Sequence, residues 1–205
     1  MIDGVDKGLL IVISGPSGAG KSTVISRVLK SNPDIVFSVS ATTRLPRDGE
    51  REGIDYYFTA FSQFMEMIAR GELLEYAEYV GNYYGTPKAR VFEDIENGKS
   101  VVLDIEVQGA MQVKEKYPQA VLIFLIPSSF SEIERRLRGR ASDDEEKILL
   151  RIETAKKEYS LAQSYDYIVL NDGEDLAEHE ILSIICAEKC KTVNRKKYLT
   201  EGVLA

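Results

Sequence analysis

The sequence has little of what several classes of protein depend on. It contains two cysteines, Cys186 and Cys190, and one histidine, His179, so we expect neither a disulfide framework nor a histidine-rich metal cluster. The formal net charge of −7 argues against a nucleic-acid-binding protein that works through a general basic surface. The longest apolar runs, such as residues 121–127, are too short to cross a membrane. We therefore expect no nucleic-acid partner and no membrane.

The first residues also lack the features of a secretion signal. Residues 1–7 have no basic segment and no apolar core, so we expect a cytoplasmic protein whose two thiols stay reduced. With 205 residues, of which 44% are hydrophobic and 29% charged, the chain suits one α/β domain with insertions and a sizeable core. The sequence leaves open whether the protein is a monomer or a homo-oligomer.

The most specific short motif is GPSGAGKST at residues 15–23, which fits the P-loop pattern at every fixed position. Residues 9–13 before it predict a buried strand, and residues 22–30 after it predict a helix. In this setting the N–H groups of the loop and the helix N-terminus face a phosphate. We expect Lys21 to reach the β- and γ-phosphates and Ser22 to bind Mg²⁺. The predicted phosphate-binding residues are Gly15, Pro16, Ser17, Gly18, Ala19, Gly20, Lys21, Ser22 and Thr23.

Five segments predict buried strands, because most of them are near-continuous apolar runs of the kind found in parallel sheets covered on both faces. Helical patterns lie between them, which predicts a doubly wound α/β core. Asp104 and Glu106 end the third strand, and Asp104 could hold Mg²⁺ or its waters there. A polar strand end without a function is the alternative. The five segments are residues 9–14, 36–42, 101–106, 120–126 and 167–171.

The first interruption of this alternation runs over about residues 38–97, which is too long for a plain crossover and predicts an inserted subdomain. It holds a loop with several arginines, a short helix over residues 62–70, and a hairpin. The hairpin pairs residues 73–80 with 83–85 across Gly81 and Asn82. Thr86 is expected to be the N-cap of a helix that begins at Pro87.

The second interruption, about residues 132–152, predicts a helix–loop–helix lid with four arginines between positions 135 and 140. Ser129 with Glu132, and Ser142 with Glu145, match the capping-box pattern. A solvated, charged helix face is the alternative for these arginines. The core would then comprise about residues 1–37, 98–131 and 153–205.

A second phosphate site is predicted from the loop of the insertion. Arg44 and Arg47 are spaced to bracket an anion, and Tyr56 and Tyr84 could add hydroxyl donors. Each of these residues alone is weak evidence for a phosphate site, since loop arginines are usually just solvated. No convincing general base is present in the sequence, and an anionic phosphate acceptor needs none, because positioning and charge neutralisation suffice.

Taken in order, these motifs resemble guanylate kinase. The resemblance covers nearly the whole chain and is far more specific than the P-loop alone. Thr86 stands where serine is common in the family, and Glu106 stands where aspartate is common. The matching segments after the P-loop are residues 40–47, 53–58, 75–76, 81–86, 104–109 and 136–140, Arg151, and residues 169–172.

The resemblance implies a P-loop kinase core with a five-stranded sheet, a GMP-binding insertion and a helical lid. It implies transfer of a phosphoryl group from ATP to GMP, with ATP as co-substrate and Mg²⁺ as cofactor, in purine nucleotide metabolism and GMP recycling. The implied catalytic residues are Lys21, Arg44, Arg136, Arg140 and Arg151. Ser40, Arg44, Arg47, Tyr56 and Tyr84 would hold the GMP phosphate, and Glu75, Thr86 and Glu106 the base. Asn171 would lie by the adenine of ATP, and Ser22 and Asp104 would hold the metal.

The assignment of Glu75 is physically reasonable, because guanine presents its N1–H and N2 amino group as adjacent donors that one carboxylate can accept. Without the family context, an exposed strand residue would be the preferred interpretation of Glu75. Two other functions are considered. A catalytically inactive, phosphopeptide-binding relative would have a degraded P-loop, and a kinase for another phosphorylated small molecule would lack Glu75 and Thr86.

Overall fold

The computed structural model describes residues 6–79, 81–139 and 145–200. Its main sheet has five strands in the order β2-β7-β1-β8-β9, and every neighbouring pair is parallel. The predicted five-stranded parallel sheet is confirmed. Its strands are β1 (Leu10–Ser14), β2 (Ile35–Phe37), β7 (Ser100–Asp104), β8 (Val121–Ile126) and β9 (Tyr167–Leu170).

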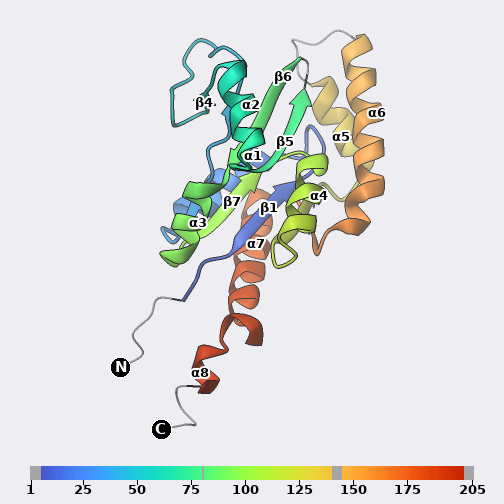
Figure 1. Cartoon of the computed structure of the whole chain (residues 1–205). Helices are drawn as coiled ribbons and strands as arrows, with labels where there is room; N and C mark the ends of the chain where they lie inside the picture. Colours follow the sequence, from blue (N-terminus) through green and yellow to red (C-terminus); the bar gives the residue numbers. More distant parts are fainter. Residues whose placement is uncertain (1–5, 80, 140–144, 201–205) are drawn as a thin grey trace.

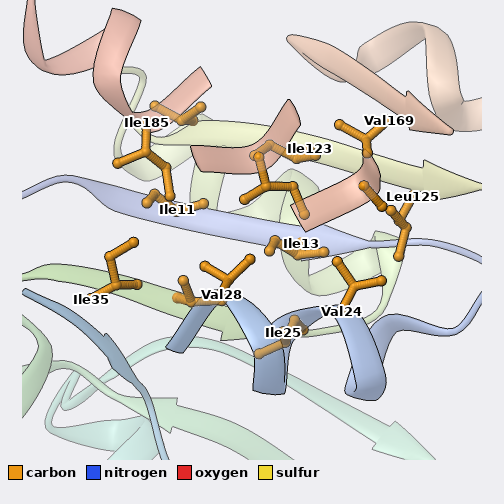
Figure 2. Packing of buried hydrophobic residues seen from close by; sticks show 14 of the residues in the cluster. Ile11, Ile13, Val24, Ile25, Val28, Ile35, Ile123, Leu125, Val169 and Ile185 are labelled. Carbon is orange, nitrogen blue, oxygen red and sulfur yellow. The ribbon is translucent and has the colours of Figure 1, made fainter. Parts of the chain in front are cut away.

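One face of the main sheet is covered by α1 (Lys21–Ser31) and α7 (Glu174–Lys189). Successive side chains of a strand point to opposite faces, and Ile11 and Ile13 of β1 are the ones that pack on this side. They meet Val24 and Val28 of α1, and Ile185 of α7 (Figure 2). The alternation in β1 thus places its odd-numbered residues against these two helices.

The opposite face is covered by α3 (Lys88–Glu96) and α4 (Val107–Lys116). Leu10 and Val12 of β1 pack there with Val113 of α4. Leu74 belongs to the same buried cluster, although it lies on a strand of the second sheet. Burial on both faces explains why the strands read as near-continuous apolar runs, and it makes the sheet doubly wound as predicted.

The insertion forms a second sheet of four strands in the order β4-β3-β6-β5. Its buried apolar cluster consists, among the described residues, of Ala41, Phe64 and Leu73, with partly buried side chains around them. In Figure 1 this sheet and α2 lie beyond the carboxyl ends of the main strands. The elements are β3 (Ala41–Thr42), β4 (Tyr57–Phe58), α2 (Phe61–Ala69), β5 (Leu73–Tyr79) and β6 (Asn82–Pro87).

The predicted single strand over residues 36–42 is wrong. The chain pairs with β7 up to Phe37, and Ser38 donates its N–H to Val102. It then leaves the main sheet, and Ala41 and Thr42 pair with β4 and β6 of the second sheet. Both ends of the segment are strands, so its residue pattern does not reveal that they belong to different sheets.

The predicted N-cap at Thr86 is also wrong. β6 continues to Pro87, and α3 begins at Lys88 with Pro87 as its N-cap. The Thr86 side chain is fully buried, and its hydroxyl donates a hydrogen bond to Glu75 Oε1 at 2.6 Å. The hydroxyl is therefore used by a buried carboxylate and not by the helix.

The predicted lid, about residues 132–152, falls on α5 (Phe130–Arg138) and the first half of α6 (Glu145–Leu161), and these helices pack on each other through Ile133, Ile148 and neighbouring apolar residues. Ser129 precedes α5, but its side chain makes no capping bond and contacts the Ser131 hydroxyl, so this capping box is wrong. Ser142 lies outside the described residues. The remaining elements are η1 (Ala162–Ser164), η2 (Thr192–Asn194) and α8 (Lys197–Thr200). No helix within the described ranges is both long and apolar enough to cross a membrane.

Candidate functional site

The P-loop connects the end of β1 to the start of α1, as the sequence predicts. Gly20 caps the helix in the left-handed region, with a φ of 88°, and a Cβ there would lie 2.4 Å from Asn171 Nδ2. Asn171 is buried and donates from Nδ2 to the Ala19 carbonyl at 2.7 Å. Only glycine fits this position, because the loop is held directly against the Asn171 amide.

A hollow of about 450 Å³ lies over this loop. It brings together P-loop residues, Arg136 of the lid and Asn171, which follows β9. Such a hollow can take a nucleotide, because the N-terminus of α1 favours phosphate. The lining residues are Gly18, Gly20, Ser22, Thr23, Arg136, Asn171, Asp172, Gly173 and Glu174.

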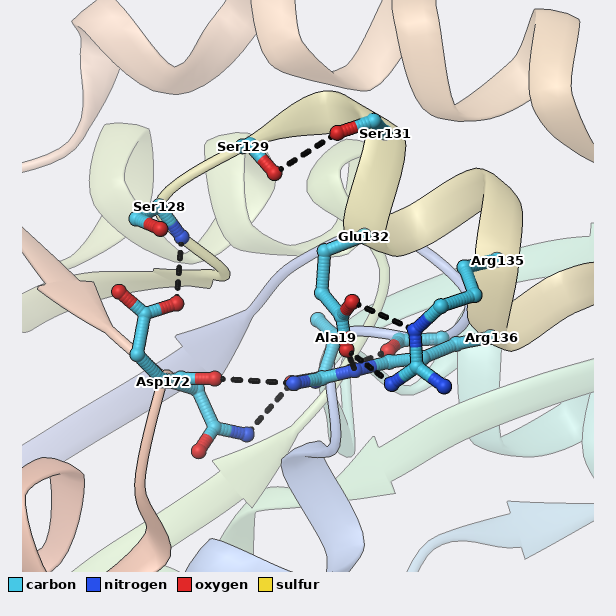
Figure 3. Close-up of polar contacts among 10 residues, drawn as sticks. Ala19, Ser128, Ser129, Ser131, Glu132, Arg135, Arg136 and Asp172 are labelled. Carbon is cyan, nitrogen blue, oxygen red and sulfur yellow. Dashed lines mark hydrogen bonds and ion pairs between the residues drawn. The ribbon is translucent and has the colours of Figure 1, made fainter.

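Arg136 lies directly against the P-loop. Its NH1 donates to the carbonyls of Gly18 and Ala19 at 3.5 and 3.4 Å, and its NH2 donates to the Asn171 carbonyl at 3.1 Å. Glu132 accepts a bond from its Nε at 2.7 Å. Figure 3 shows the guanidinium between Glu132 of α5 and the loop at Ala19. A cation of the lid is therefore already placed at the phosphate-binding loop.

Lys21 and Asp104 lie at the carboxyl ends of neighbouring strands. Lys21 donates from Nζ to the Gly15 carbonyl at 2.6 Å. Asp104 ends β7 and pairs in register with Ile13 of β1. Burial raises the pKa of Asp104, while the charge of Lys21 opposes that rise. Asp104 is thus a partly buried carboxylate near a lysine, at the place where the sequence predicted a metal ligand.

Ser22 and Asp104 both line a separate hollow, beside the one over the P-loop, with a volume of about 440 Å³. Across the described ranges, no group of three or more His, Cys, Asp or Glu side chains is arranged to hold a metal ion. Mg²⁺ typically takes only one or two protein carboxylates and completes its shell with water and substrate phosphates. One hydroxyl and one carboxylate beside a phosphate-binding loop fit that requirement.

A further cavity, of about 270 Å³, is called the second cavity from here on. It is lined both by the small sheet and by residues that follow β7. It brings together five of the eight residues expected to hold GMP, and Asp104 of the predicted metal site also lines it. The five are Ser40, Tyr56, Glu75, Tyr84 and Glu106. The acceptor-side residues therefore come together from three separate parts of the sequence.

Glu75 is the buried acid of this cavity, with 5% of its surface exposed. Burial raises its pKa, and the hydrogen bond from the Thr86 hydroxyl opposes that rise. The interpretation of Glu75 as an exposed hairpin residue is therefore wrong. Thr86 is connected to this cavity through its hydrogen bond to Glu75. A buried carboxylate with few donors can accept further hydrogen bonds from a ligand.

Arg44 is held by Glu50, which the sequence analysis did not select. NH1 and NH2 of Arg44 donate to the two Glu50 oxygens at 2.9 and 2.8 Å, and the N–H of Arg47 donates to the same carboxylate at 2.7 Å. The Arg44 guanidinium, and then the Arg47 N–H, hold the pKa of Glu50 at about 2. The signal available in the sequence was an acid inside the arginine loop.

The Arg44 guanidinium also lies 5.4 Å from the centre of the ring of Tyr56, which lines the second cavity. Its Nε is buried and has no hydrogen-bond partner in the part of the chain that the structure describes. Arg47 lies on the exposed loop. The loop therefore presents one fixed and one exposed arginine at the acceptor side.

Glu158 is a further residue that the sequence analysis missed. It lies on α6, next to Glu106 and near Lys21. Burial, and then the neighbouring Glu106 carboxylate, raise the pKa of Glu158 to about 7. No sequence motif marks it, because only the packing of α6 brings it next to Glu106. The predicted Arg151 is half-buried on the same helix, and the predicted Arg140 lies outside the described residues.

Comparison with known proteins is consistent with this geometry. The sequence model of the family described as "Guanylate kinase" matches residues 7–188. A guanylate kinase from Desulfitobacterium hafniense is 49% identical over 196 residues, covering 96% of this chain and 98% of its own. One from Halalkalibacterium halodurans is 52% identical over 186 residues, 91% of each chain. The crystal structure of guanylate kinase from Anaplasma phagocytophilum superimposes with a TM-score of 0.74 at 35% identity, covering 91% of this chain and 89% of that one.

Proposed function

This chain belongs to the guanylate kinase family, and from that premise we propose that it transfers the γ-phosphoryl group of ATP to GMP, giving ADP and GDP. It is a nucleoside-monophosphate kinase, and therefore a transferase. The observation that carries the choice of GMP is the buried Glu75 carboxylate in the second cavity. Guanine offers two adjacent donors to such a carboxylate, whereas adenine would leave it unpaired.

We assign ATP to the P-loop hollow. The backbone N–H groups of the loop and the α1 N-terminus would bind its phosphates, and Lys21 would exchange the Gly15 carbonyl for phosphate oxygens. Arg136 already lies over the loop and would neutralise charge on the group in transfer. Arg140 and Arg151 are assigned the same task through the resemblance. Asn171 would act near the adenine and also holds the loop at Ala19.

We assign GMP to the second cavity. Arg44, Arg47 and the hydroxyls of Ser40, Tyr56 and Tyr84 would hold its phosphate, and Glu75, Thr86 and Glu106 its base. The attacking atom is an anionic phosphate oxygen, so no side chain has to remove a proton. The work of the protein is to align acceptor with donor, to exclude water and to neutralise charge.

Ser22 and Asp104 are the residues that would hold Mg²⁺. When bound with ATP, Mg²⁺ would offset the negative charge of the phosphates. Burial makes Asp104 harder to ionise, and Lys21 counteracts this, so this pair keeps a carboxylate available beside the loop.

The division of the chain is also a proposal. The core would comprise about residues 1–37, 98–131 and 153–205, with the GMP-binding insertion at about 38–97 and the lid at about 132–152. A cytoplasmic location, a lack of nucleic-acid and membrane partners, and a monomeric or homo-oligomeric state stay predictions of the sequence.

One assay tests the function. ATP is offered with GMP, AMP, CMP or UMP in turn, with and without Mg²⁺, and ADP formation is followed by a coupled reaction. We expect turnover with GMP far above that with the other nucleotides, and only with Mg²⁺. Turnover with none of them would favour a phosphopeptide-binding module, and turnover with another acceptor would favour a different P-loop kinase.

A further inference from the structure

Helix α4 of the core docks on the outer strand of the small sheet. β5 is an edge strand in the order β4-β3-β6-β5, so the backbone groups on its outer side are not used by another strand. At Tyr76, the side chain of Gln112 of α4 bonds these backbone groups in place of a neighbouring strand. Its Nε2 donates to the Tyr76 carbonyl at 2.9 Å, and its Oε1 accepts from the Tyr76 N–H at 3.3 Å. α4 and β5 lie side by side in Figure 1.

The same helix also holds the residue on the other side of Glu75. Lys116 donates from Nζ to the Leu74 carbonyl at 3.1 Å. Leu74 and Tyr76 flank Glu75, so α4 fixes the backbone on both sides of the buried acid. The β5–β6 pairing shifts register between Leu73 and Tyr76, so the strand ladder is irregular where Glu75 lies. Its position therefore depends on α4.

Gly109 gives the carboxylate its room. A Cβ at Gly109 would lie 2.6 Å from Glu75 Oε2 and 3.2 Å from its Cδ. Gly109 precedes Gln112 by three residues and Lys116 by seven, so all three share one face of α4. Glycine is a poor residue inside a helix, and here its missing side chain is where Glu75 lies.

We propose that Gly109 is a specificity-determining position, which together with Gln112 and Lys116 sets where the Glu75 carboxylate meets the base. This inference deepens the proposed function and rests on it. Gly109 also lines the second cavity beside Glu75 and Glu106. A side chain at position 109 would move the carboxylate without touching the P-loop hollow.

The test is Gly109→Ala. The added methyl meets the far end of a flexible side chain, and alanine is the better helix former, so we expect no fall in Tm. We expect kcat/KM for GMP to fall by about 30-fold or more, chiefly through KM, because the carboxylate no longer matches the two guanine donors. The KM for ATP should stay within about twofold, since the donor side is built elsewhere.

Two further variants of α4 are compared with Gly109→Ala. Glu115→Ala changes an exposed residue of the same helix and should leave both KM values within about twofold. Gln112→Ala removes two partly solvated hydrogen bonds at Tyr76 and should lower kcat/KM for GMP by about 3–10-fold. A graded loss confined to GMP is what positioning of Glu75 predicts.

A double variant separates positioning from general damage. Glu75→Asp shortens the acid by one methylene, which leaves space for a methyl at position 109. The loss in Glu75→Asp/Gly109→Ala should therefore be smaller than the product of the two single losses. A GMP efficiency within about threefold of the parent in Gly109→Ala, or equal losses for GMP and ATP with a lowered Tm, would overturn the inference. A parent chain that phosphorylates no GMP would overturn the proposed function itself.

Discussion

The P-loop hollow and the second cavity are lined in different ways. The first lies over the P-loop, whose backbone N–H groups lead into α1, and it belongs to the larger buried core. The second is lined by polar side chains, and its small sheet has a buried apolar cluster of Ala41, Phe64 and Leu73 among the described residues. Backbone N–H groups can bind any phosphate, whereas a buried carboxylate selects its partner. The chain thus separates phosphate binding from base recognition.

Lys21 offers the largest test of this contrast, because it is the lysine of the P-loop itself and its Nζ lies against the Gly15 carbonyl. Lys21→Ala should lower kcat by about two orders of magnitude or more, since one preorganised cation at the transferred group is lost. Steady-state kinetics measure this, with thermal unfolding to confirm that the fold remains. Lys30→Ala, an exposed lysine later in α1, is the matched control and should turn over normally. Near-normal kcat in Lys21→Ala would remove the assigned role.

Glu75→Gln tests the second cavity in the same way. The amide keeps the size of the acid but offers one acceptor and points a donor at a donor. We expect kcat/KM for GMP to fall by about 30-fold or more, because losing a buried charged hydrogen bond typically costs about 2–5 kcal/mol. The KM for ATP should barely change, and the gap between GMP and AMP should narrow.

Kinetics with both nucleotides at saturating ATP measure the effect of Glu75→Gln. Glu78→Gln, on the same strand but exposed, serves as the control. If the GMP efficiency of Glu75→Gln stayed within about threefold of the parent, base recognition would belong to other residues.

Glu50→Gln tests whether the phosphate end of the acceptor site depends on a preset arginine. The amide can accept only part of the bidentate hydrogen bonding that fixes Arg44, so the guanidinium should sample more positions. We expect the KM for GMP to rise by about 3–10-fold with a smaller change for ATP. Asp48→Asn, an exposed change in the same loop, is the control. A lowered KM for GMP would instead mark Glu50 as a competitor of the phosphate.

The smallest expected effect is a dependence of stability on pH at Glu158 of α6, which lies next to Glu106. The pKa of Glu158 is raised from 4.5 to about 7, so the folded chain holds this proton more tightly than the unfolded chain. Its contribution to stability is therefore full below about pH 4.5 and is lost as pH rises through about 7. In Glu158→Gln the side chain stays neutral throughout.

Thermal unfolding at about pH 5 and about pH 8 measures this difference. The Tm of the parent relative to Glu158→Gln should fall by about 1–3 °C between the two values. Glu153→Gln, exposed on the same helix, should show no such change. An unchanged difference between parent and Glu158→Gln would mean that folding does not raise the pKa of Glu158.

The sequence predicted the parts of the fold that are set by local pattern. Apolar runs marked the five main strands, and the P-loop motif marked its own turn. The division of residues 36–42 between two sheets could not be predicted, because both halves are extended and differ only in their distant partners. Thr86 was assigned to a helix cap because its true partner, Glu75, lies on the neighbouring strand.

The candidate site shows the same limit. Residues within compact motifs, such as those of the P-loop and the loop around Arg44, were selected from spacing. Glu158 was not, because it comes near Glu106 only through the packing of α6. Glu50 stands within the arginine loop of the sequence, but an acid among arginines indicates only surface charge. The structure adds its two hydrogen bonds to Arg44. Tertiary packing, and not residue type, gives both of them their place.

Leu74 has a consequence for how the molecule unfolds. It belongs to β5 of the small sheet, yet it is fully buried in the cluster formed by β1, β7, α3 and α4. The insertion therefore shares a hydrophobic side chain with the core, and its own cluster is small. Residues 38–97 expressed alone would keep α3 but would lose the contacts of that leucine with β1, β7 and α4. Amide hydrogens of β5 should exchange with solvent at rates close to those of the core, while those of the short strand β4 exchange through local opening.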